Sequence, residues 1–244
     1  MIWTKKGGKI MIEKLTFKVF GYPEQEIRKI LSEIGVTPIL VEVKCLDAKI
    51  VFTVESTDRQ AVTESVYRRF TGAVYADHDQ TIAGALVERL RLFGKTMSVA
   101  ESLTGGMIAS SIVDVPGCSE CFMEGVVTYS NTAKIARLGV NPQTLSQFGA
   151  VSSQVACQMA LGLIRTGVNL AVSTTGIAGP GGGSAEKPVG LVYIGVADEV
   201  KCTATECHFE GTRQEIRTLA ANTALFLLWK KSIKPIDFDN MVIE

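Results

Sequence analysis

A serine stands in a short polar turn between a predicted strand and a predicted helix. The stretch "SVAESLTGG" runs from Ser98 to Gly106, and the small and apolar residues before Glu101 indicate a strand. Ser102 and Thr104 then bring hydroxyl groups to a glycine-rich turn that opens a helix. A plain turn needs one glycine or one capping residue. The additional polar groups indicate a nucleophile close to helix N–H groups that suit a developing oxyanion.

The general base for this serine has few candidates in the chain. The α/β-hydrolase elbow G-x-S-x-G is absent around Ser102. The only histidines, His78 and His208, make a Ser-His pair hard to build. Serine–lysine chemistry is the remaining option, and "TYSNTAK" supplies Lys134, five residues after a tyrosine. If Asn131 caps the following helix, Lys134 lies in its first turn, where the helix dipole and burial lower a lysine pKa. The alternative is a surface lysine at a helix start.

A second concentration of polar and glycine residues runs from Thr174 to Gly190 and contains "GIAGPGGGS". It follows a predicted strand, and ligands of open α/β sheets bind beyond the carboxyl ends of strands. The stretch lacks the lysine of the P-loop motif, and it lies too late in the chain for a Rossmann fingerprint. We interpret it as a ligand-facing loop, with a flexible surface connection as the alternative.

Composition narrows the class of protein. The 244 residues include 25 Lys and Arg against 25 Asp and Glu, and 46% are hydrophobic. Zero formal net charge argues against broad nucleic-acid affinity. No apolar run reaches the roughly 20 residues that span a bilayer. The start of the chain has no apolar core of signal-peptide length. We therefore expect a cytoplasmic protein with neither nucleic-acid nor membrane partners.

Six cysteines are present, and we expect them to be reduced. Cys118 and Cys121 have the C-x-x-C spacing that suits a metal or redox site. A zinc site needs two further ligands, and the chain has no second C-x-x-C. We interpret the two residues as a stray pair in a loop and expect no metal.

Residues 1–78 are predicted to form a small α+β module. An alternating strand, "KLTFKVFG", precedes the helix "PEQEIRKILSEIG". Two strands, "PILVEVKCL" and "KIVFTVE", flank a tight turn at Asp47 and Ala48, and the helix "STDRQAVTESVYRRF" follows. This β-α-β-β-α order suggests a ferredoxin-like or KH-like module. Residues 14–80 contain no GXXG loop of the kind that clamps RNA, so we do not expect RNA binding.

Residues 79–231 are predicted to form a layered α/β domain. Helical and strand patterns alternate along it, and the strands "LVYIGVAD" and "KCTATECHFE" are expected to pair around Glu199, which makes the sheet mixed. The helix "TRQEIRTLAANTALFLLWKK" closes the domain, and residues 232–244 form a tail. The expected fold class is therefore α/β, a layered mixed-sheet domain with a small N-terminal α+β module.

Five stretches of the second domain resemble one known family. They are "AESLTGG", "VVTYSNTAK", "GAVSSQVACQMA", "TTGIAGPGGGSAEKPVG" and "FEGTRQEIR". In order and spacing they are similar to the carboxy-terminal domain of the CinA family, the nicotinamide-nucleotide amidases. The resemblance covers about residues 80–231. The first module resembles, more loosely, the KH-type middle domain of longer CinA proteins.

The resemblance implies a reaction. The amide of nicotinamide mononucleotide would be hydrolysed to nicotinate mononucleotide and ammonia, with no cofactor and no metal. Ser102 would be the nucleophile, and Lys134 would take its proton and later hand one to ammonia. Tyr129 would orient the lysine or relay the proton.

The resemblance also implies where the nucleotide binds. Backbone N–H groups of Thr104, Gly105 and Gly106 would hold the oxyanion. Glu101 would either fix the Ser102 loop or contact ribose hydroxyls. Ribose and phosphate would meet donors of the glycine-rich loop and two cations, namely Thr175, Gly176, Gly179, Ser184, Lys187 and Arg213.

The family likeness further implies a homodimer. Two other classes of function stay open. One is a catalytically inactive nucleotide-binding module, or one associated with competence or DNA repair. The other is a structural subunit that assembles through the first module.

Overall fold

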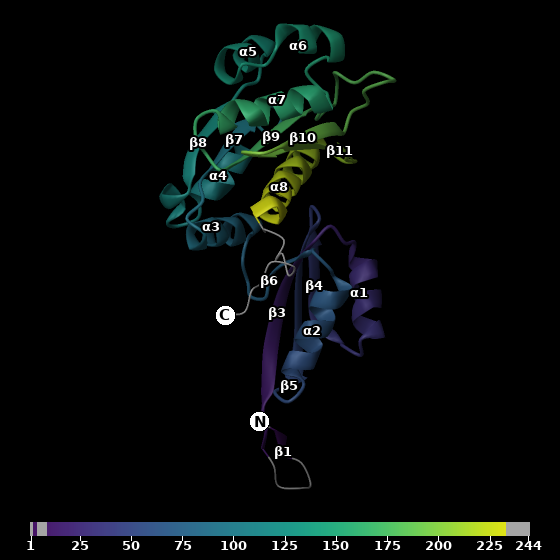
Figure 1. Ribbon diagram of the computed structural model, residues 1–244. Helices are drawn as coiled ribbons and strands as arrows, with labels where there is room; N and C mark the ends of the chain where they lie inside the picture. The colour runs from purple at the N-terminus through teal and green to yellow at the C-terminus, as the bar shows by residue number, and fades with distance from the viewer. Residues whose placement is uncertain (1, 4–8, 233–244) are drawn as a thin grey trace.

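The computed structural model describes residues 2–3 and 9–232, and it consists of two parts that lie end to end (Figure 1). An N-terminal α+β module lies below a larger α/β domain in this view. The predicted tail, residues 232–244, falls outside the described residues except for Ser232, which ends the last helix.

The N-terminal module is a four-stranded antiparallel sheet covered by two helices on one face. Its elements are β3 (Ile12–Phe20), α1 (Glu24–Glu33), β4 (Pro38–Lys44), β5 (Asp47–Glu55), α2 (Arg59–Arg69) and β6 (Val74–Ala76), preceded by the short pair β1 (Ile2–Trp3) and β2 (Lys9–Ile10). The strand order is β4-β5-β3-β6, and all pairs are antiparallel. The element order β-α-β-β-α-β is that of the ferredoxin-like motif, one of the two alternatives.

The hairpin turn of this module lies two residues earlier than expected. Asp47 and Ala48 belong to β5, and the turn is made by Cys45 and Leu46, whose φ angles are 48° and 66°. Turns with two positive φ angles usually contain Asn or Gly, and this sequence cue is missing here. Leu46 packs against the core of the second domain, which explains an apolar residue in a strained turn.

The second domain is built on a five-stranded mixed sheet. Its strands are β7 (Met97–Glu101), β8 (Phe122–Val127), β9 (Leu170–Gly176), β10 (Leu191–Asp198) and β11 (Cys202–His208), in the order β11-β10-β9-β7-β8. β7 runs parallel to β8 and β9, whereas β10 is antiparallel to both β9 and β11. The expected α/β class, the mixed sheet and the pairing of the last two strands, β10 and β11, are confirmed.

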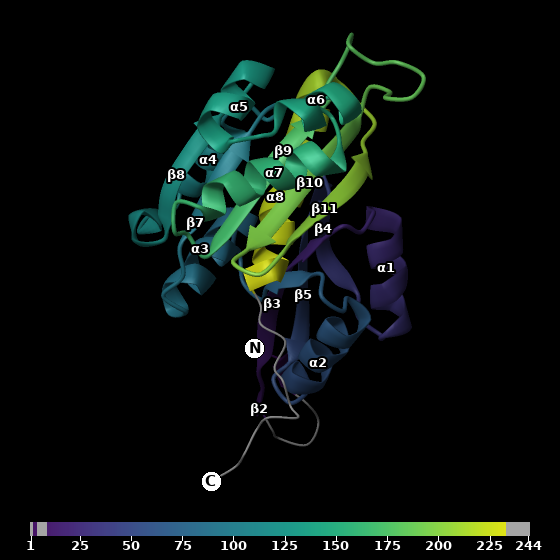
Figure 2. The same cartoon turned by 45° about the horizontal axis from the view of Figure 1, so that its top comes forward.

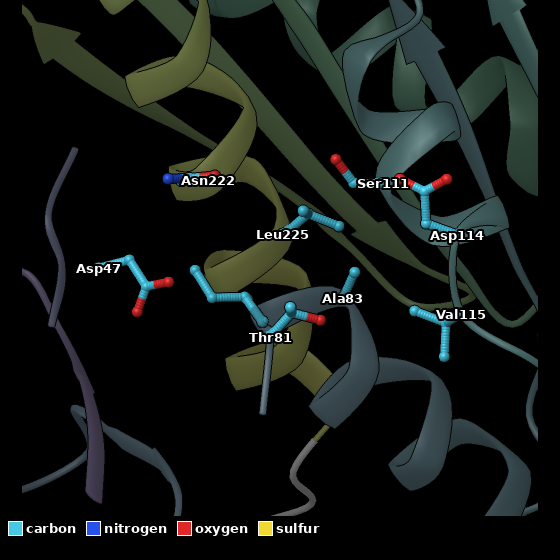
Figure 3. A pocket seen from close by; sticks show the side chains of 9 residues that line it. Asp47, Thr81, Ala83, Ser111, Asp114, Val115, Asn222 and Leu225 are labelled. Atoms are coloured by element: carbon cyan, nitrogen blue, oxygen red, sulfur yellow. The ribbon is translucent and has the colours of Figure 1, made fainter. Parts of the chain in front are cut away.

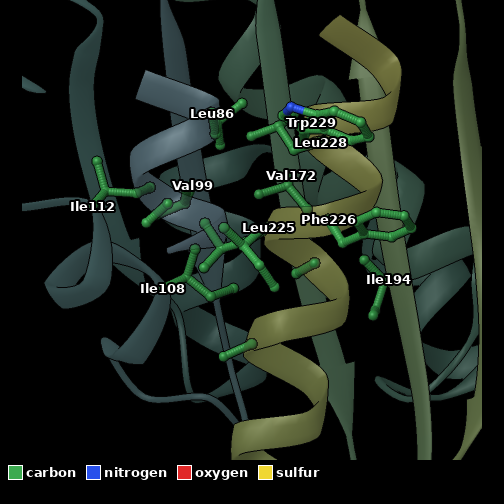
Figure 4. Packing of buried hydrophobic residues seen from close by; sticks show 14 of the residues in the cluster. Leu86, Val99, Ile108, Ile112, Val172, Ile194, Leu225, Phe226, Leu228 and Trp229 are labelled. Carbon is green, nitrogen blue, oxygen red and sulfur yellow. The ribbon is translucent and has the colours of Figure 1, made fainter. Parts of the chain in front are cut away.

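Helices cover both faces of this sheet (Figures 1 and 2). α5 (Asn131–Leu138), α6 (Pro142–Phe148) and α7 (Ser153–Ile164) lie on one side, and α3 (Ile82–Leu92), α4 (Met107–Val113) and α8 (Arg213–Ser232) lie on the other; η1 (Cys118–Glu120) is a single 3-10 turn. Every residue of β7 is buried, as expected for a parallel strand between two helical layers. Val99 belongs to the cluster under α8 (Figure 4), and its neighbour Ala100 to the cluster under α7.

Side-chain caps define where the helices of one layer begin. The Ser130 hydroxyl accepts the N–H of Ala133, so Ser130 caps α5 and Asn131 is its first residue. This corrects the expectation that Asn131 is the cap; serine and asparagine serve equally well, and Ser130 has the extended backbone that a cap needs. Ser152 caps α7 in the same way.

α8 joins the two parts of the molecule. Phe226 stacks on Phe20 of the module with ring centroids 4.5 Å apart. Asn222 donates its side-chain N–H to the carbonyl of Cys45 at 3.2 Å. The carboxyl half of α8 therefore holds the module, while its first turns lie beside the loops at the sheet edge. Within residues 2–3 and 9–232, no helix has the length and apolar character needed to cross a bilayer.

Candidate active site

Three parallel strands end at the same edge of the sheet, and most of the predicted site lies there. β7 ends at Glu101, β8 at Val127 and β9 at Gly176. Because the strands are parallel, the segments that follow them emerge side by side. The fold thus brings Ser102 and Lys134 together although they are 32 positions apart.

Ser102 and Lys134 form a buried pair. Lys134 Nζ lies 3.0 Å from Ser102 Oγ. It also donates to the carbonyl oxygens of Thr128, at 2.7 Å, and Tyr129, at 3.2 Å. Lys134 has no exposed surface, and Ser102 is 8% exposed. The alternative of a surface lysine at a helix start is thereby excluded.

Burial changes the acid–base behaviour of this lysine. Removing the ammonium group from water lowers the pKa of Lys134 to about 8. At this value about a tenth of the molecules carry a neutral amine at pH 7. A neutral amine 3.0 Å from a serine hydroxyl has the position and the basicity of a general base.

Tyr129 contacts the lysine through its backbone. Its carbonyl oxygen accepts the lysine N–H, while its side chain is 64% exposed and lines the cavity beside Ser102. Tyr129 was expected either to orient the lysine or to relay the proton. The contact between its carbonyl oxygen and Lys134 supports the first of these roles. The phenol makes no hydrogen bond to Lys134 within the described residues.

Glu101 fixes the loop that carries the serine. Its carboxylate has no exposed surface and accepts three backbone N–H groups, from Gly106 at 2.8 Å, Ile108 at 3.2 Å and Ala109 at 2.8 Å. It thereby caps α4 and neutralises the positive end of that helix. Two roles were expected for Glu101, and these contacts match the first, which is to fix the Ser102 loop. The buried carboxylate offers no surface to a ribose.

The loop uses the N–H groups of both its glycines internally. Gly105 donates to the carbonyl of Ser102 at 3.2 Å, and Gly106 donates to Glu101. Neither N–H is free for an oxyanion in this conformation. The Thr104 hydroxyl is buried and shares a hydrogen bond of 2.8 Å with Thr174. The Thr104 hydroxyl and the N–H groups of Gly105 and Gly106 thus form internal hydrogen bonds that hold the loop.

A cavity of about 200 Å³ opens beside the pair. Its lining residues are Ser102, Leu103, Tyr129, Lys134, Ala150, Val151, Thr175, Gly176, Ala178 and Arg213. Of the predicted binding residues it therefore contains Thr175, Gly176 and Arg213. The Thr175 hydroxyl donates to the carbonyl of Ala150 at 2.8 Å, which ties the end of β9 to the turn before α7.

Gly179, Ser184 and Lys187 lie outside the cavity lining, and Arg213 connects the cavity to the glycine-rich loop. Arg213 Nη1 donates to the carbonyl of Gly179 at 2.6 Å, which anchors the start of the glycine-rich loop. Lys187 Nζ donates to the carbonyls of Phe148, at 2.5 Å, and Val151, at 2.7 Å. The Ser184 hydroxyl bonds Glu186 within the loop at 2.9 Å. The loop projects from the body between β9 and β10 (Figures 1 and 2).

Sequence reasoning missed one residue beside the serine loop. Arg217 donates from Nε to the carbonyl of Leu103 at 3.0 Å and from Nη2 to that of Thr104 at 2.9 Å. A sequence signal was available, because Arg217 lies four positions after Arg213 and shares its helix face.

A second cavity, of about 280 Å³, lies between the two parts of the molecule (Figure 3). It is lined by Asp47, Thr81, Ile82, Ala83, Ser111, Asp114, Val115, Asn222 and Leu225. None of the predicted site residues is among them. Although it is larger, it has no nucleophile–base pair, so the cavity beside Ser102 is the candidate active site.

The C-x-x-C pair lies away from this site. Cys121 is buried in the core, where burial raises the pKa of its thiol, and Cys118 lies in the turn η1. Across residues 2–3 and 9–232, no group of three or more His, Cys, Asp or Glu side chains is placed to hold a metal ion.

Comparison with known proteins identifies relatives that match about nine tenths of this chain. A family model for the CinA C-terminal domain matches residues 79–232. A CinA-like protein of Geotalea uraniireducens is 40% identical over 232 residues, covering 90% of this chain and 55% of the relative. One from Endomicrobium trichonymphae is 39% identical over 237 residues, covering 88% and 54%. The chain thus spans about half the length of these curated relatives.

Solved structures share sequence and fold with about three fifths of this chain. The competence/damage inducible protein CihA from Agrobacterium tumefaciens is 43% identical with a TM-score of 0.57, covering 63% of this chain and 97% of that one. A competence-damaged protein (CinA) superfamily protein from Escherichia coli is 32% identical with a TM-score of 0.58, covering 61% and 87%.

Proposed function

The chain belongs to the CinA family, and we propose that it is an amidohydrolase that converts nicotinamide mononucleotide into nicotinate mononucleotide and ammonia. One observation carries the reaction type: a buried lysine with a pKa lowered to about 8 lies 3.0 Å from a serine hydroxyl at a cavity. The choice of substrate rests on the family resemblance.

The contacts of Lys134 suit a base. A neutral amine has two N–H bonds and one lone pair. The carbonyls of Thr128 and Tyr129 accept the two N–H bonds, which leaves the lone pair directed at Ser102 Oγ. The serine O–H can then donate to the amine, and attack on a carbonyl carbon transfers that proton to Lys134.

The reaction proceeds in two stages. Ser102 Oγ bonds the carboxamide carbon, and the new ammonium of Lys134 protonates the amide nitrogen as the C–N bond breaks, which releases ammonia and leaves an ester on the serine. Water then attacks the ester while Lys134 takes its proton. The lysine returns this proton to Ser102 Oγ as the ester bond breaks, so the enzyme is restored and the carboxylate product leaves.

The charges around the cavity favour an anionic amide. Its lining contains the cations Lys134 and Arg213 and no carboxylate. Arg213 uses Nη1 to hold Gly179, and its remaining N–H groups are available to a phosphate, for which a planar guanidinium is well shaped. The ring of Tyr129 at the cavity supplies an aromatic surface for the base.

The test is ammonia release from nicotinamide mononucleotide by the purified protein. Ser102→Ala and Lys134→Ala are each expected to lower turnover at least a hundredfold, about 2.7 kcal/mol of barrier. Ser65→Ala, at a half-buried position of α2, and Lys29→Ala, on the exposed face of α1, are the matched controls and retain parental turnover.

Two outcomes would contradict the proposal. If Ser102→Ala retains turnover, the proposed substrate is supported but the proposed serine–lysine mechanism is wrong. A folded parent that binds the nucleotide without releasing ammonia would favour the alternative class, an inactive nucleotide-binding or competence-associated module. That class has support in the names of the relatives from Agrobacterium and Escherichia.

We also propose that the protein is a cytoplasmic homodimer. Although the element order of its first module is ferredoxin-like, we propose that this module corresponds to the KH-type middle domain of longer CinA proteins. The described cysteines are all free, which fits a reducing compartment. The dimer and the KH likeness rest on family resemblance. Sedimentation of the full chain tests the dimer, and a single species at monomer mass would overturn it.

A further inference from the structure

Three consecutive carbonyl groups after the nucleophile are held in place. The carbonyl of Ser102 accepts the N–H of Gly105 at 3.2 Å. The carbonyls of Leu103 and Thr104 accept Nε and Nη2 of Arg217, at 3.0 and 2.9 Å. Two of the three peptide groups that follow Ser102 therefore depend on one side chain from another element.

The contact from Arg217 is long-range and two-pronged. Its partners, Leu103 and Thr104, lie 114 and 113 positions earlier in the chain, so the contact joins α8 to the loop that carries Ser102. Its third group, Nη1, bonds Gln214 on the same helix at 3.2 Å. A guanidinium is planar and holds two of its donor nitrogens in a fixed relative position, so it sets the orientation of both carbonyls together. A lysine ammonium would have to reach both carbonyls from one rotatable nitrogen.

Fixing these carbonyls also fixes the N–H groups of the same peptide planes. In a trans peptide the N–H points opposite to the C=O. The carbonyls of Ser102 and Leu103 share their planes with the N–H groups of Leu103 and Thr104. Within the described residues neither N–H makes a hydrogen bond. Both belong to the loop of Ser102, and Leu103 lines the same cavity as the serine.

We propose that the N–H groups of Leu103 and Thr104 bind the oxyanion and that Arg217 positions them. It positions the Thr104 N–H directly, through the Leu103 carbonyl. It positions the Leu103 N–H indirectly, because the Thr104–Gly105 peptide that it holds donates its N–H to the Ser102 carbonyl. The proposal rests on the amide hydrolysis proposed above and changes one part of it, because the N–H groups of Gly105 and Gly106 are occupied. A cation that bonds a peptide carbonyl also polarises that peptide, which makes its N–H a stronger donor to a developing negative charge.

The expected loss follows from what an oxyanion donor contributes. Removing one such donor lowers kcat by about 10²–10³. Because the oxyanion exists only after attack, the loss falls on kcat while KM stays nearly constant. A merely structural role for Arg217 would alter folding or substrate binding instead.

The experiment compares Arg217→Ala, Arg217→Lys and Gln214→Ala in the full chain. Ammonia release from nicotinamide mononucleotide gives kcat and KM, and thermal unfolding reports the fold. Arg217→Ala is expected to lose about a hundredfold in kcat with KM within threefold of the parent. Arg217→Lys keeps the charge and loses the fork, so it is expected to lose nearly as much. Gln214→Ala removes only the third contact and retains parental kcat. Guanidinium ion at a non-denaturing concentration is expected to restore part of the activity of Arg217→Ala.

A second readout does not depend on the substrate. Phenylmethanesulfonyl fluoride sulfonylates a reactive serine: Ser102 Oγ bonds the sulfur, fluoride leaves, and Lys134 takes the proton. A sulfonyl oxygen would occupy the oxyanion position. Intact mass gives the rate, which Arg217→Ala and Arg217→Lys are expected to lower at least tenfold relative to the parent.

The two readouts separate the two proposals. If the parent protein is sulfonylated and both Arg217 substitutions slow that reaction, this inference is supported even when the parent does not hydrolyse the nucleotide. In that case only the proposed substrate is wrong. Parental hydrolysis that Arg217→Lys leaves unchanged overturns this inference alone. A folded parent with neither hydrolysis nor sulfonylation overturns both.

Discussion

Two glycine-bearing loops leave the same edge of the sheet, and they are held in different ways. The loop at Ser102–Gly106 follows β7 and is bonded from three sides, by Glu101, Thr174 and Arg217. The loop from Ile177 to Gly190 follows β9, and its central residues are exposed. Its ties to other elements lie near its ends, through Arg213 at Gly179 and through Lys187 at the turn before α7.

The topology accounts for this difference. The first loop passes directly into α4, beneath α8, so Ser102, Leu103 and Thr104 are buried and most of their polar groups have partners. The second connects β9 to its antiparallel neighbour β10, and the hydrogen bonds of Ile177 with Leu191 and Gly190 close it at the base. Beyond this base it needs no core packing. A loop that holds a nucleophile in one geometry is therefore expected to be far more sensitive to substitution than its neighbour.

The largest contrast is expected at two glutamates. Glu101→Gln removes a buried negative charge from three N–H donors and is expected to cost about 3 kcal/mol of unfolding free energy, because charged hydrogen bonds in the interior are costly to break. Glu186→Gln in the exposed loop is expected to change it by less than about 0.5 kcal/mol. Urea unfolding of both variants measures the pair, and equal effects would contradict the comparison.

The buried lysine is expected to cost stability. Its folded pKa, about 8, lies below its unfolded value of 10.5, so the unfolded state binds more protons between these limits and stability rises with pH there. Lys134→Met is therefore expected to stabilise the fold by about 1–2 kcal/mol at pH 7, with a gain that shrinks as pH rises above 8. The exposed control Lys29→Met should show no such pH-dependent difference, and a destabilised Lys134→Met would refute the cost.

The same pKa sets the pH dependence of the proposed hydrolysis. Only the neutral amine accepts a proton, so kcat/KM is expected to rise about tenfold per pH unit below pH 8 and to level off above it. Rate measurements from pH 6 to pH 10 test this. A profile that is flat through pH 8 would remove Lys134 as the base. Lys187→Ala, in the other loop, is expected to leave the midpoint unchanged.

The smallest contrast is expected at two glycines. Gly105 has a φ of 60°, and an added Cβ would lie 3.3 Å from Arg217 Nη2, so Gly105→Ala is expected to cost about 1 kcal/mol. Gly181 has open space around it, and Gly181→Ala is expected to be neutral or slightly stabilising, by up to about 0.5 kcal/mol. If chemical unfolding shows both substitutions to be equally tolerated, the Ser102 loop is less constrained than its contacts indicate.

Local patterns in the sequence were enough to predict much of the fold. Hydrophobic periodicity and capping residues located the helices and strands, the mixed sheet and the junction that carries Ser102. They placed Lys134 near a helix start but could not decide between a base and a surface side chain. The turn at Cys45 and Leu46 was missed because its conformation is imposed by packing against the second domain and not by turn residues.

Residue type and local spacing, which depend only on neighbours in the chain, are what the sequence by itself determined: a serine at a strand end, a lysine in a first helical turn, and glycines where loops begin. The tertiary structure decided the rest. Burial lowers the pKa of Lys134, and the side chain of Lys187 donates to backbone carbonyls before α7. Packing of α8 places Arg217 beside carbonyls more than a hundred positions earlier in the chain. Desolvation and long-range hydrogen bonding arise only when distant segments pack together, so no local pattern contains them.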